Sequence, residues 1–220
     1  MPQVIELLKL SPQELEAAID QTVETLALGE VIVAPLEHSY AYICDAFNKE
    51  AVMRLHELRG NPVGVAAQVI IPSASMLAGL SQPVTGVLKD ITDKFWPGLL
   101  TLNLTQSMSL SWDLGDGGEL TEFAVRCPAQ DFILKVMEQS GALCITSASA
   151  VGNPPARTIE ETTALFAYVA LTIDGGQLPE GQASTVLSLS REGQATLLRE
   201  AAITLAQLSE VIPELSAPAE

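Results

Sequence analysis

Large apolar residues recur along this chain at two spacings, one typical of amphipathic helices and the other of buried strands. The first helical stretch begins at Ser11, which is followed by a proline and then by Glu14, the pattern of a capping box. Apolar residues then recur every three or four positions from Leu15 to Leu26, and Gly29 is suited to end the helix. The pattern therefore predicts a helix from Ser11 to Gly29.

The rest of the chain continues the alternation of helical and strand-like segments. We expect further helices over residues 48–59, 83–94, 129–139 and 205–211, with another capping-box helix start at 158–161. We expect strands over residues 30–34, 63–71, 99–104, 123–127, 142–147, 169–173, 185–189 and 196–198, and a loop or hairpin tip over 112–122. Because helices and strands intermingle without a linker or an internal repeat, we predict one α/β domain over residues 1–212. Its sheet should be twisted and mixed with flanking helices, followed by a flexible tail over 213–220.

Composition and terminal sequence narrow the class of protein. Hydrophobic residues make up 48% of the 220 positions and charged residues 17%, which favours a folded globular protein over a disordered one. No apolar run approaches the roughly 18 residues that a membrane-spanning helix needs. The first residues also lack the basic start and apolar core of a signal peptide. These features predict a cytoplasmic protein without a membrane partner.

The charge balance makes the few basic residues informative. The chain carries 27 acidic and 11 basic side chains, a formal net charge of −16, which disfavours broad binding to nucleic acid. A local basic pocket for one nucleotide remains compatible with that charge. The cysteines Cys44, Cys127 and Cys144 lie in apolar, strand-like surroundings, so we interpret them as buried thiols and predict no metal site.

A run of small hydroxyl residues marks the first candidate site. Thr146-Ser147-Ala148-Ser149 directly follows the predicted strand over 142–147, and Gly152, Asn153 and two prolines come next. Open α/β sheets bind ligands at the carboxyl ends of their strands, where hydroxyls and backbone N–H groups meet phosphates or carboxylates. Such Ser/Gly-rich segments are also common in plain turns, so both interpretations stay open.

Several segments together resemble the YrdC family, over about residues 26–211. The matching strings, in order, are Val33-Ala34-Pro35 through Cys44-Asp45-Ala46, residues 54–62, Phe95-Trp96-Pro97-Gly98 with Leu100-Thr101-Leu102, Ala124-Val125-Arg126-Cys127-Pro128, Thr146-Ser147-Ala148, Asp174-Gly175-Gly176, Ser184-Thr185-Val186 and Leu198-Arg199. The resemblance implies an α/β domain whose twisted sheet folds around a deep cavity. It also implies L-threonylcarbamoyladenylate synthase activity, in which ATP with magnesium, L-threonine and bicarbonate give threonylcarbamoyl-AMP and pyrophosphate for tRNA modification. The family's domain is also associated with double-stranded RNA.

The resemblance assigns catalytic and nucleotide-binding roles to residues at two places. Arg59 stands where the family has the lysine of a Lys-x-Arg pair, and Asn61 replaces the arginine. Ser147 matches the serine of a Ser-x-Asn pair, and Ser149 replaces the asparagine. Arg59, Ser147 and Ser149 are therefore the expected catalytic residues, with Arg59 and Ser147 also contacting the nucleotide.

Two further nucleotide-binding residues are carried over from later segments. Thr101 and Arg199 match positions that the family uses around ATP. Glu200 follows Arg199 directly, and we expect this carboxylate to neutralise part of the guanidinium charge.

The expected amino-acid side of the pocket departs most from the family pattern. Leu36 and His38 replace two threonines, so His38 is either a half-buried loop histidine or a new contact to an altered substrate. Arg126 is either a partner for a substrate carboxylate or phosphate, or half of a structural ion pair. Ser184 matches a Ser-Thr pair beside the amino acid. His38, Arg126 and Ser184 are thus the expected substrate-binding residues.

Two functional hypotheses follow. The first is a nucleotidyltransferase of the threonylcarbamoyl-AMP synthase type, with an altered amino-acid substrate or reduced activity. The second is a non-catalytic paralogue whose cleft binds a nucleotide or double-stranded RNA, because replacement of charge-assisted phosphate contacts lowers the rate steeply. Both depend on residues 38, 59, 126, 147 and 199 converging on one hollow.

Overall fold

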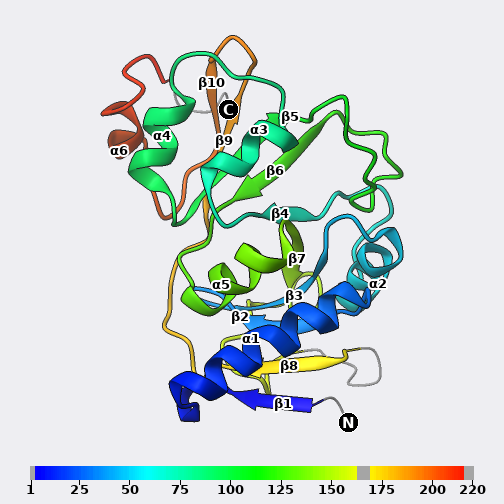
Figure 1. Ribbon diagram of the computed structural model, residues 1–220. Helices are drawn as coiled ribbons and strands as arrows, with labels where there is room; N and C mark the ends of the chain where they lie inside the picture. The colour runs from blue at the N-terminus through cyan, green and yellow to red at the C-terminus, as the bar shows by residue number, and fades with distance from the viewer. Residues whose placement is uncertain (1–2, 163–168, 216–220) are drawn as a thin grey trace.

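The computed structural model describes residues 3–162 and 169–215, and its strands form one open, mixed sheet. Ten strands follow the spatial order β1-β8-β2-β3-β7-β4-β6-β5-β9-β10, with β1 and β10 at the two edges (Figure 1). Their bounds are β1 Gln3–Glu6, β2 Ile32–Pro35, β3 Tyr40–Asp45, β4 Gln68–Ile70, β5 Leu100–Thr105, β6 Glu122–Arg126, β7 Leu143–Ser147, β8 Leu171–Asp174, β9 Thr185–Leu189 and β10 Ala195–Arg199. The predicted α/β class with a mixed sheet is confirmed.

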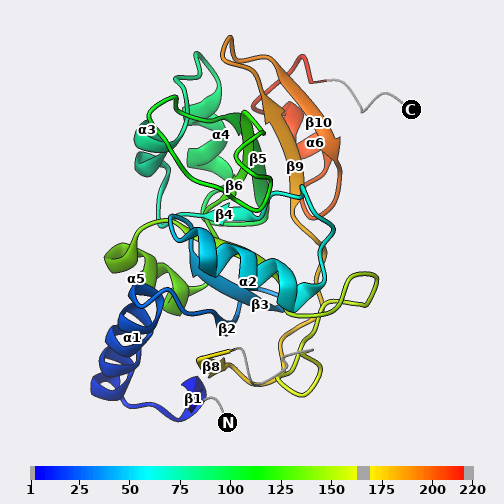
Figure 2. The ribbon, with the colours of Figure 1, turned by 90° about the vertical axis from the view of Figure 1, so that its right-hand side faces the viewer.

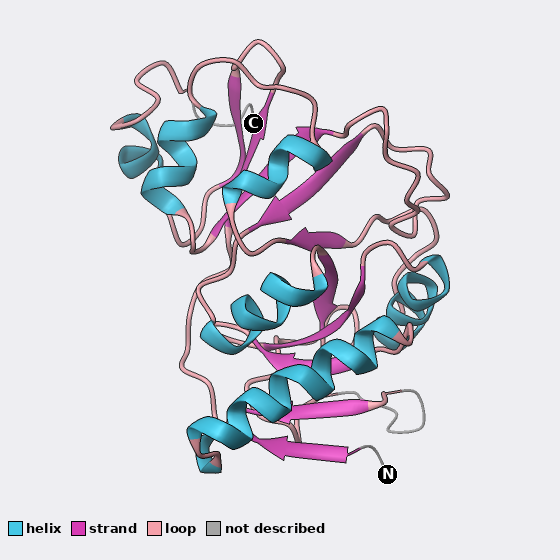
Figure 3. Ribbon diagram, in the orientation of Figure 1, coloured by secondary structure: helices cyan, strands magenta, loops and turns pink. Residues whose placement is uncertain are grey.

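Helices flank the sheet along its whole length (Figure 3). The α-helices are α1 Pro12–Ala27, α2 Lys49–Arg59, α3 Leu77–Leu80, α4 Leu88–Phe95, α5 Asp131–Ser140 and α6 Leu205–Ser209, and two 3₁₀ turns cover Leu7–Lys9 and Ala74–Met76. α1 and α5 pack against each other and against one face of β2, β3 and β8, whereas α3, α4 and α6 lie in the half of the molecule that holds β5, β9 and β10 (Figures 1 and 2).

Buried side chains form two hydrophobic cores because successive strand residues point to opposite faces of the sheet. Val31 and Val33 belong to the core that contains the buried side of α2. Ile32 and Ala34, which alternate with them, belong to the core that contains the buried sides of α1 and α5. The sheet is therefore covered on both faces, which explains why its central strands read as continuous apolar runs.

The first helix is built as its sequence predicts. The Ser11 side chain accepts a hydrogen bond from the Glu14 N–H, and the Glu14 carboxylate accepts one from the Ser11 N–H, which completes the capping box. Gly29 follows the helix with φ of 75°, a conformation that glycine adopts without strain. The predicted start and end of this helix are both confirmed.

Two predicted elements are much shorter in the structure. The expected strand over 63–71 pairs only at Gln68–Ile70, because Gly60 and Gly64 adopt left-handed conformations (φ 74° and 85°) that direct residues 60–67 into a loop. The expected helix over 83–94 begins only at Leu88, because Gly86 has φ of 79° and breaks the helical path. The apolar content of the two segments did not indicate that the strand and the helix would start later than predicted.

The remaining differences concern short segments. β1 and β3 were not predicted, although the Tyr40–Asp45 run is apolar. Where a helix start was expected at 158–161, residues 158–162 form bends and a turn, and the Glu161 carboxylate accepts a hydrogen bond from the Arg157 N–H. Residues 163–168, which follow, lie outside the described residues. Leu215 is buried, and residues 216–220 of the predicted tail also lie outside the described residues. Within the described ranges, no helix combines the length and apolarity that crossing a membrane requires.

Candidate functional site

A cavity of about 540 Å³ gathers most of the residues that the sequence singled out. Arg59, Arg126 and Arg199 line it together with His38 and Ser147. No aspartate or glutamate among the described residues lines this cavity, although the chain carries 27 acidic side chains. The predicted convergence of distant segments is confirmed, and the hollow is electropositive within an acidic protein.

Arg59 reaches the cavity from the last turn of α2, which ends at the left-handed Gly60. Its Nη1 donates to the carbonyl oxygens of Ser147 (3.1 Å) and Ser149 (3.2 Å), just beyond the end of β7. Partial burial lowers the pKa of the guanidinium. The arginine is thus held in place by two neutral acceptors, and in the described part of the chain its positive charge has no ion-pair partner.

Of the two serines that match the family's Ser-x-Asn pair, one lines the cavity and the other is buried behind it. Ser147 lines the cavity, and its Oγ lies 2.8 Å from the Ser149 Oγ. Ser149 is 3% exposed and is not among the lining residues. Ser149 is therefore placed to orient the Ser147 hydroxyl, and any catalytic contact of its own stays a prediction.

A hydrogen-bonded chain supports the opposite wall. Thr101 on β5 is buried, and its hydroxyl accepts from Gln68 Nε2 (2.9 Å) and lies 2.8 Å from Ser184 Oγ. Arg199 at the end of β10 donates from Nε and Nη2 to the Ser184 carbonyl (3.1 and 2.7 Å). Thr101 thus stands behind the lining residues Ser184 and Gln68.

Glu200 forms no ion pair with Arg199 in the described residues, and its partial neutralisation of that guanidinium stays a prediction. The Glu200 carboxylate accepts a hydrogen bond from the Leu205 N–H at 2.8 Å, at the start of α6. Arg199 is exposed, and in the described residues it donates hydrogen bonds to oxygens of Ser184. Glu200 serves the helix start because a free N–H group there needs an acceptor.

Arg126 forms a buried ion pair, which settles one open alternative. Its Nη1 lies 2.6 Å from Glu37 Oε1, with the two side chains 6% and 11% exposed. The same carboxylate oxygen accepts from the Ala129 N–H at 2.8 Å. Arg126 therefore has a structural partner while it still lines the cavity, and its Nε is buried without a partner in the described residues.

His38 lies at the junction of the cavity and a smaller inner hollow of about 100 Å³ that both it and Arg126 line. Its ring packs so closely on Gly181 that a side chain at that position would overlap it. The His38 Nδ1 is buried, and no hydrogen-bond partner reaches it from the described part of the chain. A buried nitrogen without a partner is uncommon in folded proteins, so His38 is an unusual residue of this cavity wall.

The polar lining residues that were not predicted as site residues include Gln68, Asn153 and Gln182. Gln68 lies in the segment read as a continuous apolar strand, and Gln182 precedes the matched Ser184 by two positions. Asn153 belongs to the hydroxyl-rich segment after β7, and its position there was the one available signal. None of the three belongs to a motif that identifies a ligand contact.

The cysteines do not supply a nucleophile. Burial raises the pKa of Cys127 to about 11, and its Sγ donates to the Pro72 carbonyl. Burial also raises the pKa values of Cys44 and Cys144. Their thiols therefore stay protonated near neutral pH.

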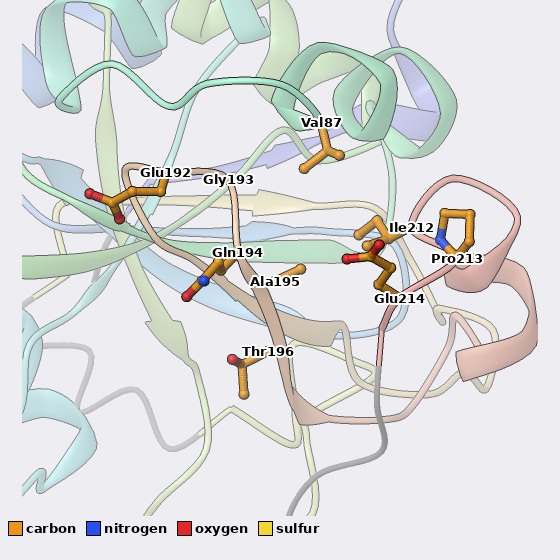
Figure 4. A pocket seen from close by; sticks show the side chains of 9 residues that line it. All are labelled: Val87, Glu192, Gly193, Gln194, Ala195, Thr196, Ile212, Pro213 and Glu214. Carbon is orange, nitrogen blue, oxygen red and sulfur yellow. The ribbon is translucent and has the colours of Figure 1, made fainter.

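A second hollow of about 590 Å³ lies away from these residues, beside β10 and the chain after α6 (Figure 4). Glu192 and Glu214 line it, together with Gln194 and Thr196, and no basic side chain does so in the described ranges. Its acidic lining is unsuited to a nucleotide triphosphate.

Comparison with known proteins finds one matching family model and several similar proteins. Residues 24–201 match the family model Sua5/YciO/YrdC, described as telomere recombination. The putative threonylcarbamoyl-AMP synthase of Mycobacterium tuberculosis (strain CDC 1551 / Oshkosh) is 26% identical over 202 residues, 91% of this chain and 92% of its own. The threonylcarbamoyl-AMP synthase of Bacillus subtilis (strain 168) is 32% identical over 197 residues, 88% of this chain but only 56% of its own.

Solved structures agree with the sequence comparison. The crystal structure of P. abyssi Sua5 complexed with L-threonine has a TM-score of 0.84 and 26% identity, and the match covers 100% of this chain and 67% of that one. E. coli YciO has a TM-score of 0.76 at 24% identity and shows the fold alone. Because the family model spans most of the chain and the architecture agrees, this protein belongs to the Sua5/YciO/YrdC family.

Proposed function

We propose that this protein is a nucleotidyltransferase of the threonylcarbamoyl-AMP synthase type that acts in tRNA modification in the cytoplasm. The single observation that carries the proposal is the convergence of Arg59, Arg199 and Ser147 on one acid-free cavity of about 540 Å³. Relatives named threonylcarbamoyl-AMP synthase, which match 83–91% of this chain, support the reaction class. A triphosphate requires positioned cations and hydrogen-bond donors, and both are present.

The residues that line the cavity suggest separate roles in the transfer of the adenylyl group from ATP. A carbamate oxygen of the carboxylated amino acid forms a bond to the α-phosphorus of ATP while the bond to the bridging oxygen of pyrophosphate breaks. Arg59 and Arg199 would neutralise the charge that develops on the phosphates, and the Ser147 hydroxyl would donate a hydrogen bond to them. The leaving pyrophosphate carries the displaced electron pair.

Magnesium would enter with the nucleotide as part of the substrate. The Glu37 carboxylate, which lines the adjoining smaller hollow, is engaged by Arg126 and the Ala129 N–H. In the described ranges no cluster of three or more histidine, cysteine or acidic side chains could hold a metal ion. The lining therefore fits magnesium held by ATP phosphates better than magnesium held by protein carboxylates.

The amino-acid side supports an altered substrate preference. Leu36 and His38 lie where the family resemblance places hydroxyl residues, and both line the inner hollow together with Ser184. The imidazole of His38, whose Nδ1 has no hydrogen-bond partner among the described residues, stands where the family resemblance places a threonine hydroxyl, so this wall presents a different hydrogen-bonding group. Substrate preference is therefore tested across several small amino acids besides L-threonine.

The decisive experiment measures pyrophosphate released from ATP with magnesium, bicarbonate and an amino acid. We expect release that requires all components and falls strongly in Arg59→Ala, but not in Arg191→Ala, an arginine exposed outside the cavity. Release that is the same in both variants would contradict the proposed site. Absence of release with every small amino acid would contradict the enzyme.

The second candidate is a non-catalytic paralogue whose cleft binds a nucleotide or double-stranded RNA. It is favoured by Arg126, whose charge is already balanced by Glu37, and by the burial of Ser149 behind Ser147. A thermal shift with ATP in the absence of pyrophosphate release would support nucleotide binding without catalysis. Binding of an RNA duplex, despite the net charge of −16, would instead support the RNA role.

A further inference from the structure

A loop over residues 60–67 forms one wall of the cavity. His56, which lies outside the cavity, contacts Asn61 at the start of this loop and the Leu114 carbonyl, to which Ala67 at the end of the loop donates. Asn61, Val65 and Ala67 are among the loop residues that line the hollow. The loop contains two left-handed glycines and the fully exposed Val63, so little apolar burial holds its middle. Its position must come from its ends.

The first end is attached to the imidazole of His56, one turn before the end of α2. Asn61 Nδ2 lies 2.8 Å from His56 Nδ1, and the Asn61 N–H donates to the His56 carbonyl at 3.0 Å. The amide nitrogen of Asn61 is therefore engaged with the imidazole. Asn61 stands where the family resemblance places an arginine that contacts phosphate, and here its amide nitrogen has a different partner.

The second end is attached to the carbonyl that the same imidazole contacts. The Ala67 N–H donates to Leu114 O at 2.7 Å, and His56 Nε2 lies 2.8 Å from that oxygen. Because a carbonyl oxygen can only accept, Nε2 carries the proton and Nδ1 accepts from Asn61. The two contacts together define one neutral tautomer of His56.

The backbone leaves space for this ring. Gly115 follows Leu114 with φ of 103°, and a side chain there would overlap the His56 ring. Both the conformation and the close approach require glycine. The 112–118 turn is thus shaped to bring the Leu114 carbonyl to the imidazole.

We propose that His56 is a positioning residue that fixes the 60–67 loop as a preformed wall of the nucleotide side of the cavity, acting through Asn61 and Leu114. This inference rests on the proposed function only for its effect on ATP. The wall includes residues adjacent to Arg59, so loosening it misplaces the part of the cavity that the nucleotide would occupy.

Hydrogen–deuterium exchange of the full chain tests the loop independently of activity. His56→Ala and Asn61→Ala should each speed exchange in residues 61–67 by about tenfold, the effect of losing one hydrogen bond of ordinary net strength. Exchange in α5 should not change, which excludes general unfolding. Glu57→Ala, an exposed neighbour on the same helix, is the matched control and should behave as wild type.

The double variant shows whether His56 and Asn61 hold the loop together as one unit or through independent contacts. If His56 and Asn61 act as one unit, His56→Ala/Asn61→Ala should exchange no faster than His56→Ala alone. Additive effects, or unchanged exchange in both single variants, would overturn the proposal. Long-range ¹H–¹⁵N NMR should find the proton of His56 on Nε2, and a proton on Nδ1 in its place would also overturn it.

ATP affinity provides the functional readout. In His56→Ala the KM for ATP should rise several-fold while the KM for the amino acid stays unchanged, and His56→Gln, which keeps one acceptor and one donor, should recover part of the loss. Equal changes in both KM values would overturn a role specific to the nucleotide wall. If wild type binds no ATP, the proposed function fails, and the exchange experiment still decides the role of His56.

Discussion

Arg59 Nη1 lies 3.1 Å from the carbonyl oxygen of Ser147, although 88 residues separate the two positions along the chain. The contact joins the end of α2 to the end of β7, the two places where the sequence analysis predicted catalytic residues. It uses neutral acceptors, so the guanidinium keeps its full charge toward the cavity. A cation fixed in this way needs little reorganisation when a phosphate arrives.

The first prediction concerns this cation. Arg59→Ala should weaken ATP binding by about 10- to 100-fold, because a charge-assisted hydrogen bond contributes about 1.5–3 kcal/mol. The affinity of Arg59→Lys should lie between those of wild type and Arg59→Ala, since an ammonium keeps the charge but not the reach and geometry of the guanidinium. Isothermal titration with ATP measures both, and equal affinity in wild type and Arg59→Ala would refute the role.

A second prediction concerns the buried hydroxyl behind the opposite wall. Thr101→Val removes the acceptor of Gln68 Nε2 and the partner of Ser184 Oγ while keeping the side-chain shape. The free energy of unfolding should fall by about 1–3 kcal/mol, because a donor loses its partner in a part-buried site. Urea denaturation checks this. The exposed Thr196→Val on β10 is the control and should change stability by less than about 0.5 kcal/mol.

The sequence predicted those parts of the fold that depend on local pattern. The capping box at Ser11 and the hydroxyls after β7 are both readable from neighbouring residues. Within the loop over 60–67, only residues 63–67 were predicted wrongly, because their apolar content suggests a strand, whereas Gly60 and Gly64 decide the backbone path. A single sequence shows only that glycine is present, not that φ is positive.

Site residues that belong to a family motif were predictable from the sequence, whereas individual hydrogen bonds between them and other segments were not. Arg59, Ser147 and Arg199 were found through the family resemblance and lie together as expected. The hydrogen bond from the Leu205 N–H to the Glu200 carboxylate was not predicted, because the fold brings these two groups together at the start of α6. The contact between His56 and Asn61 had no signal, because five residues of spacing across a helix end do not define a hydrogen bond.

The third prediction compares two ion pairs. Glu37→Ala leaves Arg126 buried without its partner and should lower the free energy of unfolding by about 3–5 kcal/mol. Asp93→Ala breaks the exposed pair with Lys89 and should cost at most about 1 kcal/mol. Equal losses in the two variants, measured by denaturant unfolding, would show that burial of the Arg126 pair adds nothing.

The fourth prediction concerns pH. The pKa of Cys127 is about 11 in the folded protein, whereas an unfolded cysteine ionises near pH 8.5. Because the unfolded thiol loses its proton first, this contribution to stability is complete below about pH 8.5 and is lost as the pH rises toward 11. Wild type should therefore lose more stability over this range than Cys127→Ala. Parallel pH profiles for the two proteins would contradict the raised pKa.

The central claim is that the acid-free cavity between α2, β7 and β10 holds the phosphates of ATP. A crystal structure of the protein grown with ATP and magnesium tests it most directly. We predict a triphosphate within hydrogen-bond distance of Arg59 and Ser147, with Arg199 nearby. Nucleotide bound beside Glu192 and Glu214, or a cavity that stays empty at saturating ATP, would contradict the account.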